Sequence, residues 1–358
     1  MIAYYAHSHG SGHCNYAQLM AQYHPEKTIV FTDSDFNFDP DISVVHLDNE
    51  HCNGEELDVQ VFGTPEYLHY APIGLSKITR RNQQILSEVI KREVSLMIID
   101  VSVEVAALAR VSSIPYVYVK MMGNRDDAAH LNAYEGALFL VAYYPESFEP
   151  ESTPQWIRNK TLYLGFISKF SLQPPLYVSE VPFIKNRFTV VVLQGFGGNQ
   201  IDDSFVQQLS SQLEMAQIFL VGDIEVNTTM PNVTCVGKVS NTMPYIHGAD
   251  LLIAACGSNT TAEIITAKKQ FLILSEERPY DEQLIFSEAL ERNEIGIRVQ
   301  MNNISDCVEK LCALPPLEHT DQYMGSFRTF WNWLDDLNFD LKTIGNKVAS
   351  HYQKTYSA

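Results

Sequence analysis

The sequence is short of basic residues, of long apolar runs and of a secretory leader. Its 25 Lys and Arg face 43 Asp and Glu, which gives a formal net charge of −18 at pH 7. Nucleic acids and anionic membrane surfaces are bound by clustered Lys and Arg, so this balance argues against both partners. No apolar run approaches the ~18 residues of a membrane span. The apolar start, residues 2–6, is too short for a signal peptide.

Paired cysteines are also missing. The six cysteines show neither a Cys-x-x-Cys pair nor a His and Cys spacing that suits a metal; they are Cys14, Cys52, Cys235, Cys256, Cys307 and Cys312. In a chain of 358 residues this usage is typical of reduced thiols, and we expect a cytoplasmic protein. This length favours two domains.

The sequence does contain one segment, residues 249–290, that combines strand and helix signals with candidate ligand-binding residues. An apolar run over 251–255 is typical of a strand covered on both faces of a parallel sheet. Gly257 ends this apolar run, and hydroxyl and amide residues that can cap a helix follow it. We therefore expect a helix over 261–267 and then a strand over 270–274. Free amides at such a helix start form an anion site. Glu263 could then reach the vicinal hydroxyls beside a bound phosphate, although an ordinary capped βαβ connection is the alternative.

Short apolar runs alternate with helical patterns along the rest of the chain, which predicts an α/β protein with two sheets. We expect domains over 1–170 and 188–322, joined by a proline-rich linker over 171–187, and a helical tail over 323–358. Gly10-Ser11-Gly12 follows the first strand as in a dinucleotide fingerprint, but Asn15 stands in place of the third glycine. A Rossmann oxidoreductase therefore stays only a distant alternative.

Residues 236–296 resemble the nucleotide-sugar half of GT-B glycosyltransferases, above all the family of peptidoglycan N-acetylglucosaminyl transferases that make lipid II. The resemblance implies a GT-B fold, in which two Rossmann-like domains face a cleft and the last helix crosses back to the first domain. It implies that a nucleoside-diphosphate sugar, with UDP favoured, is held by two glycine loops, a phosphate turn, a ribose-binding glutamate and a sugar-binding loop. The implied donor-binding residues are Gly12, Gly195, Gly197, Gly198, Val239, Met243, Gly257, Ser258, Asn259, Thr260, Glu263, Glu282 and Gln283.

Sugar transfer with inversion needs a base on the acceptor hydroxyl and positive charge near the leaving diphosphate. His13 is the candidate base, with His7 and His9 as competitors, because the imidazole pKa lies near working pH. Asp100 ends another strand and would orient the imidazole, and the sequence around it resembles plant and antibiotic glycosyltransferases. We expect helix amides rather than a metal or a cofactor to hold the diphosphate. Arg278 could add charge or simply pair with Glu276 or Glu277.

The sequence thus predicts an inverting, metal-independent hexosyltransferase acting on an unknown acceptor hydroxyl. A nucleotide-sugar epimerase or hydrolase on the same fold stays open, as does a sugar-nucleotide binding protein without a working base.

Overall fold

The apolar runs of the first half form one parallel sheet. The structure, a computed structural model, describes residues 1–8, 10–50, 63–171, 181, 183–195, 201–227, 229–336, 340 and 342–346. The strand order is β3 (Ser43–His46), β2 (Thr28–Thr32), β1 (Ile2–Tyr5), β4 (Leu96–Asp100), β5 (Tyr116–Val119), β6 (Leu140–Ala142) and β7 (Thr161–Tyr163). Most of its strands are buried on both faces, which is why they read as unbroken apolar runs. The helices of this lobe are α1 (Gly12–Ala21), α2 (Ser76–Lys91), α3 (Val103–Val111), α4 (Ala128–Gly136) and α5 (Gln155–Lys160).

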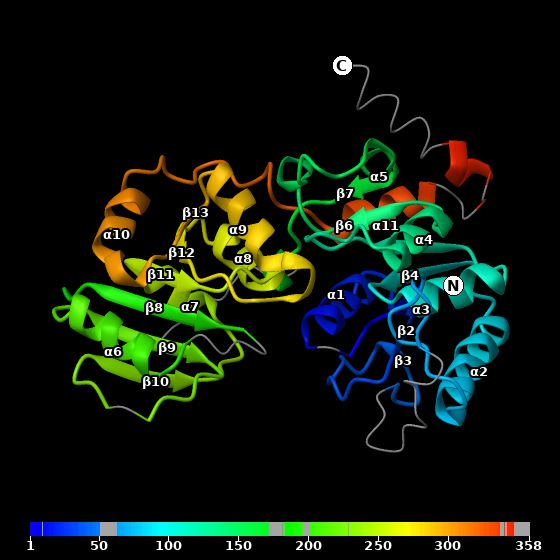
Figure 1. Cartoon of the computed structure of the whole chain (residues 1–358), viewed down its shortest axis with the longest axis horizontal. Coiled ribbons are helices and arrows are strands. Elements are labelled where there is room, and N and C mark those ends of the chain that lie inside the picture. Colours follow the sequence, from blue (N-terminus) through cyan, green and yellow to red (C-terminus); the bar gives the residue numbers. More distant parts are fainter. Residues whose placement is uncertain are drawn as a thin grey trace.

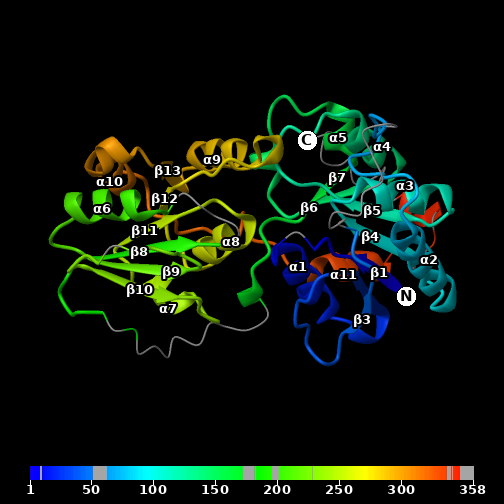
Figure 2. The ribbon, with the colours of Figure 1, turned by 60° about the horizontal axis from the view of Figure 1, so that its bottom comes forward.

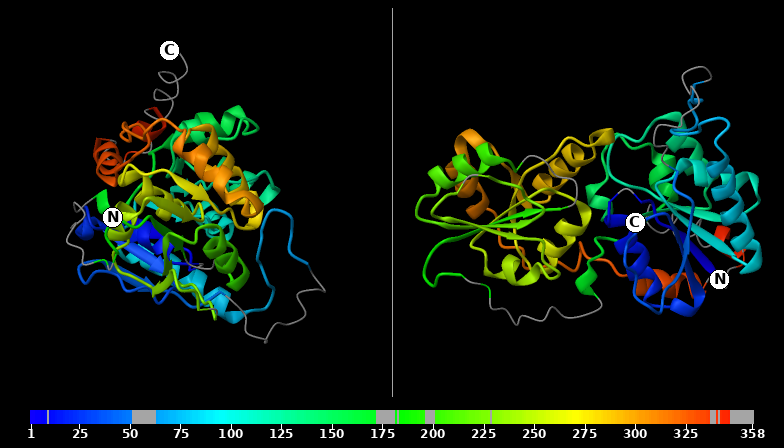
Figure 3. Two further views of the ribbon diagram at one scale, coloured as in Figure 1. Left: turned by 90° about the vertical axis from the view of Figure 1, so that its left-hand side faces the viewer. Right: turned by 90° about the horizontal axis from the view of Figure 1, so that it is seen from below.

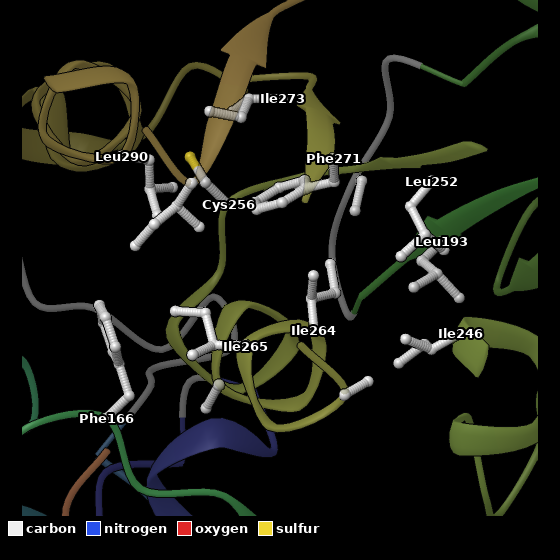
Figure 4. Close-up of a cluster of buried hydrophobic side chains, with 14 of the residues drawn as sticks. Phe166, Leu193, Ile246, Leu252, Cys256, Ile264, Ile265, Phe271, Ile273 and Leu290 are labelled. Carbon is white, nitrogen blue, oxygen red and sulfur yellow. The ribbon is translucent and has the colours of Figure 1, made fainter. Parts of the chain in front are cut away.

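The second half forms a parallel sheet of its own, in a separate lobe (Figure 1). The strand order is β10 (Val233–Gly237), β9 (Gln217–Gly222), β8 (Thr189–Gln194), β11 (Leu251–Ala254), β12 (Phe271–Ile273) and β13 (Gly296–Arg298). Its helices are α6 (Asp203–Gln212), α7 (Met243–Gly248), α8 (Ser258–Thr266), α9 (Glu282–Arg292) and α10 (Ile304–Cys312). In Figure 4, Leu193, Leu252, Ile264, Phe271 and Leu290 gather from β8, β11, α8, β12 and α9 into one buried cluster.

The chain crosses between the lobes by two segments that lie side by side. The Phe166 amide donates to the Tyr323 carbonyl at 2.7 Å, and the Gly325 amide donates to the Phe166 carbonyl at 2.8 Å. A side chain at Gly325 would lie 1.8 Å from the Leu164 carbonyl oxygen, so this close approach requires glycine. Seen from below, the lobes lie end to end with both crossing segments between them (Figure 3, right).

The last described long helix, α11 (Phe327–Asp336), returns to the first lobe (Figure 2). Its buried side chains Phe327, Phe330, Trp331 and Leu334 join the core that contains β1 and α1. The Trp331 indole also donates a hydrogen bond to the Met20 carbonyl at 2.9 Å. The expected two-sheet GT-B architecture with a returning helix is therefore confirmed, whereas the exact domain limits stay predictions.

Each sheet has one place where the strand order reverses. It lies between β1 and β4 in the first sheet and between β8 and β11 in the second. Ligands of open parallel sheets bind outside the carboxyl ends of strands at such a switch point. Asp100 is the last residue of β4, and the segments that follow the other three strands contain His13, Gly195 and Gly257; all four are sequence-predicted site residues.

Among the described residues, no helix has the length and apolar character that a membrane crossing needs. The five described cysteines are free thiols, and Cys52 lies outside the described residues.

Candidate active site between the two lobes

His13 and Asp100 meet at the switch point of the first sheet. His13 is the second residue of α1, and Asp100 is the last residue of β4. The His13 Nδ1 atom lies 2.9 Å from Asp100 Oδ2, with 15% of the histidine side chain and 1% of the carboxylate side chain exposed. The imidazole is therefore reachable from outside while its partner is buried. The two groups lie at ion-pair distance, although the geometry at Nδ1 does not form a hydrogen bond, and Nε2 is the ring nitrogen that Asp100 does not approach.

Charges around His13 favour its protonated form. Burial alone would lower the pKa of His13, but the Asp100 carboxylate, helped by Glu282, outweighs burial and the opposing Arg125 charge, so the pKa is raised. A histidine with a raised pKa is a stronger base toward a hydroxyl proton.

Asp100 is fixed by its neighbours. The Tyr4 hydroxyl donates to Oδ2 at 3.1 Å and lies 3.1 Å from the Tyr143 hydroxyl. Val101, the next residue, has a φ of 60°, which is unusual for a β-branched residue, and its carbonyl accepts from the Tyr118 hydroxyl at 2.5 Å. The strained turn directs the chain away from β4 immediately after the carboxylate.

The competing histidines are placed differently. His7 Nε2 lies 3.2 Å from Glu50 Oε1, and its ring meets the His13 ring edge-on at 6.0 Å. His7 is thus tied to a second carboxylate and does not share Asp100. His9 lies outside the described residues.

The predicted phosphate turn lies against the start of α1, next to His13 in the sequence. α8 begins at Ser258, three residues before the predicted start, because Gly257 itself is the N-cap and its carbonyl accepts from Thr261. No side chain of the described residues caps this end, so within that part of the chain the first-turn amides have no side-chain acceptor. A Cβ on Gly12 would lie 3.1 Å from Asn259 Nδ2, which shows that the starts of α1 and α8 face each other closely (Figures 1 and 2).

The second glycine loop is only partly described. A Cβ on Gly195 would lie 3.8 Å from Thr260 Oγ1, so this loop also borders the start of α8. Gly197 and Gly198 lie outside the described residues.

Glu263 is held by two groups. Its Oε2 accepts from the Thr242 hydroxyl, and its Oε1 lies 2.9 Å from Lys169 Nζ, a residue of the first crossing segment. Only 10% of the Glu263 side chain is exposed. A ribose that binds here would therefore have to share or displace Lys169.

The residues predicted to contact the base and the sugar are more enclosed than the sequence suggested. Met243 is fully buried in the second-lobe core, where Val239 packs partly buried against the same cluster. Gln283 is buried too, and its Oε1 accepts from the Glu276 amide at 2.9 Å, so the side chain fixes the loop before α9. Arg278 pairs with Glu276 at 2.7 Å.

A contact that the sequence did not indicate ties this loop to the first lobe. The Arg125 guanidinium donates to Glu282 Oε2 at 2.7 Å and lies 4.7 Å from the centre of the Tyr280 ring. The Asn124 amide donates to the Tyr280 carbonyl at 2.6 Å. At Gly123, with φ +112°, a Cβ would lie 2.6 Å from that carbonyl oxygen. We call residues 123–125 with residues 280–282 the lobe clasp.

Among the described residues, three side chains could approach one metal ion: His69, Asp127 and His130. Asp127 lies 2.9 Å from His69 Nε2 and 2.5 Å from His130 Nδ1. However, the Arg125 guanidinium is 3.2 Å from His130 Nε2, so that nitrogen accepts and Nδ1 carries the proton. A metal on Nδ1 would need the opposite tautomer, and the trio fits a hydrogen-bond network better than a metal site.

Two pairs of aspartates, Asp33 with Asp35 and Asp39 with Asp41, have a spacing that could bind a metal–diphosphate complex. Asp33 is instead 3.6 Å from the buried Arg81 guanidinium, and Asp39 accepts from Gln22 at 2.5 Å. Asp33 and Asp39 therefore contact residues of the first lobe and not the predicted phosphate turn at the start of α8.

No family model matches the chain. It is 25% identical over 232 residues to a UDP-N-acetylglucosamine–N-acetylmuramyl-(pentapeptide) pyrophosphoryl-undecaprenol N-acetylglucosamine transferase of Streptococcus uberis, covering 60% of this chain and 62% of that protein. It is 27% identical over 173 residues to a protein of the same name from Streptococcus thermophilus, covering 46% and 49%. The chain thus matches about half of the length of one relative and less than two thirds of the length of the other.

Solved structures resemble this fold along nearly the whole chain. MurG of Acinetobacter baumannii is 13% identical with a TM-score of 0.56, covering 98% of this chain and 94% of that one. Spinosyn rhamnosyltransferase SpnG in complex with thymidine diphosphate is 11% identical with a TM-score of 0.61, covering 94% and 100%. These likenesses show the fold, and the chain is a GT-B-fold relative of such proteins.

Proposed function

We propose that the protein is an inverting glycosyltransferase that moves a sugar from a nucleoside-diphosphate sugar to an acceptor hydroxyl, with a UDP-sugar as the favoured donor. One observation carries the proposal. A reachable histidine paired with a buried carboxylate stands on the first lobe, directly after Gly12, which closely approaches Asn259 at the uncapped start of α8 on the second. The names of the curated relatives and the thymidine diphosphate bound by a fold neighbour support it.

The proposed reaction uses His13 as the base. Its Nε2 accepts the acceptor hydroxyl proton as the acceptor oxygen forms a bond to the sugar C1. The bond from C1 to the diphosphate oxygen breaks on the opposite side, and its electron pair leaves with the diphosphate. Asp100 holds Nδ1 and stabilises the imidazolium that forms. Attack opposite to the leaving group inverts C1.

The proposed donor site lies on the second lobe. The amides of Ser258, Asn259 and Thr260 would face the diphosphate, because helix N-termini bind phosphate. Glu263 would accept from the ribose hydroxyls. Glu282 and Gln283 remain the proposed sugar contacts, although Gln283 would act partly by holding the loop in place.

We also propose that the reaction needs no metal and takes place in the cytoplasm. The helix amides supply the positive end of a dipole where a metal would otherwise be needed. The free cysteines suit a reducing compartment.

Hydrolysis or epimerisation of the donor is the second candidate. The observation in its favour is Glu282, whose charge acts on His13 and which could serve as an extra carboxylate near the sugar. A protein that only binds the donor differs from both by lacking turnover.

A thermal-shift screen against UDP, dTDP, GDP and NAD tests the proposal first, since a ligand that binds the native state raises the melting temperature. We expect UDP to give the largest shift and NAD none. Incubation of the favoured UDP-sugar with and without pools of hydroxyl acceptors then separates transfer from hydrolysis. A shift with NAD alone, or no shift with any nucleoside diphosphate, would contradict the proposal.

A further inference from the structure

Tyr16 lies one helical turn after His13 and therefore on the same face of α1. Its side chain is almost wholly enclosed, with the residue 4% exposed. Yet its hydroxyl, itself buried, has no hydrogen-bond partner among the residues that the structure describes. Burying a polar group without a partner is costly, and most buried side-chain polar atoms are satisfied. An unsatisfied phenol beside a candidate base therefore calls for a physical explanation.

The surroundings of the Tyr16 hydroxyl are polar and come from both lobes. The Tyr16 ring packs against Tyr143 at 4.6 Å on the first-lobe side. On the other side the hydroxyl approaches Ser258, the first residue of α8, and the charges of Asp100 and Glu282 are close enough to act on it. The phenol thus points to the place where His13 faces the open amides of α8.

The hydroxyl keeps a proton that it can donate there. Burial first and the nearby Asp100 charge second raise the pKa of Tyr16, so the phenol stays protonated at physiological pH. The charges of Asp100 and Glu282 act on it, and an anionic oxygen of a ligand at the start of α8 is an acceptor that its position suits.

We propose that Tyr16 donates a hydrogen bond from the first lobe to the diphosphate of the bound donor, opposite the α8 amides of the second lobe. This inference rests on the proposed function and adds a residue to it. As the bond from C1 to the diphosphate oxygen breaks, the electron pair and the growing negative charge go to that oxygen. The Tyr16 hydrogen bond strengthens with the charge and keeps its proton throughout. The leaving diphosphate would then be hydrogen-bonded by Tyr16 and by the α8 amides at once only when the two lobes are together.

Tyr16→Phe tests the inference because it removes one oxygen atom and keeps the ring that packs on Tyr143. Calorimetric titration with UDP and, separately, with uridine is the readout. We expect the variant to bind UDP about 10- to 100-fold more weakly, the usual effect of losing a hydrogen bond to a charged group, and uridine with unchanged affinity. A structural role alone would weaken both ligands equally.

Tyr134→Phe is the matched control. Tyr134 is also a buried tyrosine whose hydroxyl has no partner among the described residues, but it lies on α4 in the first-lobe core. We expect it to bind UDP as the wild type does. Neither variant should lower the unliganded melting temperature, since neither hydroxyl has a hydrogen-bond partner among the described residues.

A crystal structure of the wild-type protein with UDP gives a second measurement that needs no variant. The Tyr16 oxygen should lie within about 3.2 Å of a phosphate oxygen. Equal UDP affinity of Tyr16→Phe and wild type, or a Tyr16 oxygen bonded only to water in that structure, would overturn the inference. If the wild type binds no nucleoside diphosphate at all, the proposed function itself fails.

Discussion

At the scale of single residues, His13 carries the proposed chemistry and Asp100 positions it. The pairing of His13 Nδ1 with Asp100 Oδ2 at 2.9 Å leaves one nitrogen for the acceptor hydroxyl. Since His13 belongs to the first lobe and the proposed donor site to the second, removal of the base should affect turnover far more than donor binding.

His13→Ala is expected to lower kcat by roughly 10²–10⁴, the usual size of a general-base contribution. Asp100→Asn should give a smaller loss in the same step, because the imidazole loses its orienting charge. Steady-state kinetics with the UDP-sugar found by screening measures both. His7→Ala is the comparison, since His7 pairs with Glu50 rather than Asp100. If His7→Ala loses more than His13→Ala, the assignment of the base is wrong.

At the scale of elements, the turn after β4 stores strain at Val101. A β-branched residue with a φ of 60° is costly, by about 1–3 kcal/mol for such sites, whereas glycine adopts this backbone freely. Val101→Gly should raise the free energy of unfolding by about 0.5–1 kcal/mol after the entropy cost of glycine is subtracted. Urea denaturation measures the change.

The control for this prediction is Val111→Gly, at the end of α3, where the residue is 84% exposed. There glycine relieves no strain and should lower the free energy of unfolding by about 0.5 kcal/mol. If Val101→Gly destabilises the protein as much as Val111→Gly does, the turn is not strained.

The elements that could be predicted from sequence are those with local signals. The strands of both sheets are buried on two faces, so apolar runs such as 28–32 mark them directly. α4 was missed because it buries His130, Tyr134 and alanines instead of an apolar stripe. The end of β7 at Tyr163 has no such local signal, since Phe166 pairs with Met324 of the returning segment, a partner that no local pattern reveals.

The site likewise contains residues with a local sequence signal and residues whose roles depend on tertiary contacts. The glycine turn before α8 and the histidine after β1 stand next to recognisable strands, so they could be proposed in advance. Arg125, Tyr280 and Lys169 act across the lobes, and their roles depend on how the lobes meet. Tyr16 had one usable signal, its placement one turn after His13, but its enclosure by Tyr143 and Ser258 is a tertiary property.

At the scale of the whole molecule, the lobe clasp joins the two halves beside the proposed site. Behind it, Tyr280 of the second lobe meets the His130 ring edge-on at 4.8 Å, with a hydroxyl 3.2 Å from His69 Nε2. Arg125 and Asp127 face the same ring. The protonation state of His130 should therefore influence how well the lobes hold together.

Burial above all lowers the pKa of His130 to about 4, with the Arg125 charge adding to the effect. Because the folded pKa lies below the unfolded value of about 6.5, the unfolded state binds more protons between these values. The contribution of His130 to the free energy of unfolding should be fully present above pH 6.5. It should fall by roughly 2–3 kcal/mol as the pH drops toward 4.

His130→Gln should flatten this part of the pH profile, whereas His319→Gln, at an exposed position, should leave it as in the wild type. Urea denaturation at a series of pH values compares the three proteins. Parallel profiles for His130→Gln and wild type between pH 6.5 and 4 would refute the role given to His130.

The central claim is that the two lobes divide the work, with the donor bound mainly on the second lobe, assisted by Tyr16 of the first, and the base supplied by the first. Calorimetric titration of UDP into wild type, Glu263→Ala and His13→Ala tests this division without knowledge of the acceptor. Glu309→Ala, at an exposed position on α10, is the matched control for the loss of a glutamate.

We expect UDP to bind the wild type, His13→Ala and Glu309→Ala with similar affinity. Glu263→Ala should bind it more weakly by about 1–3 kcal/mol, the range of a hydrogen bond to a charged group. An unchanged affinity for Glu263→Ala, or a loss in His13→Ala as large as that in Glu263→Ala, would contradict the division of work between the lobes.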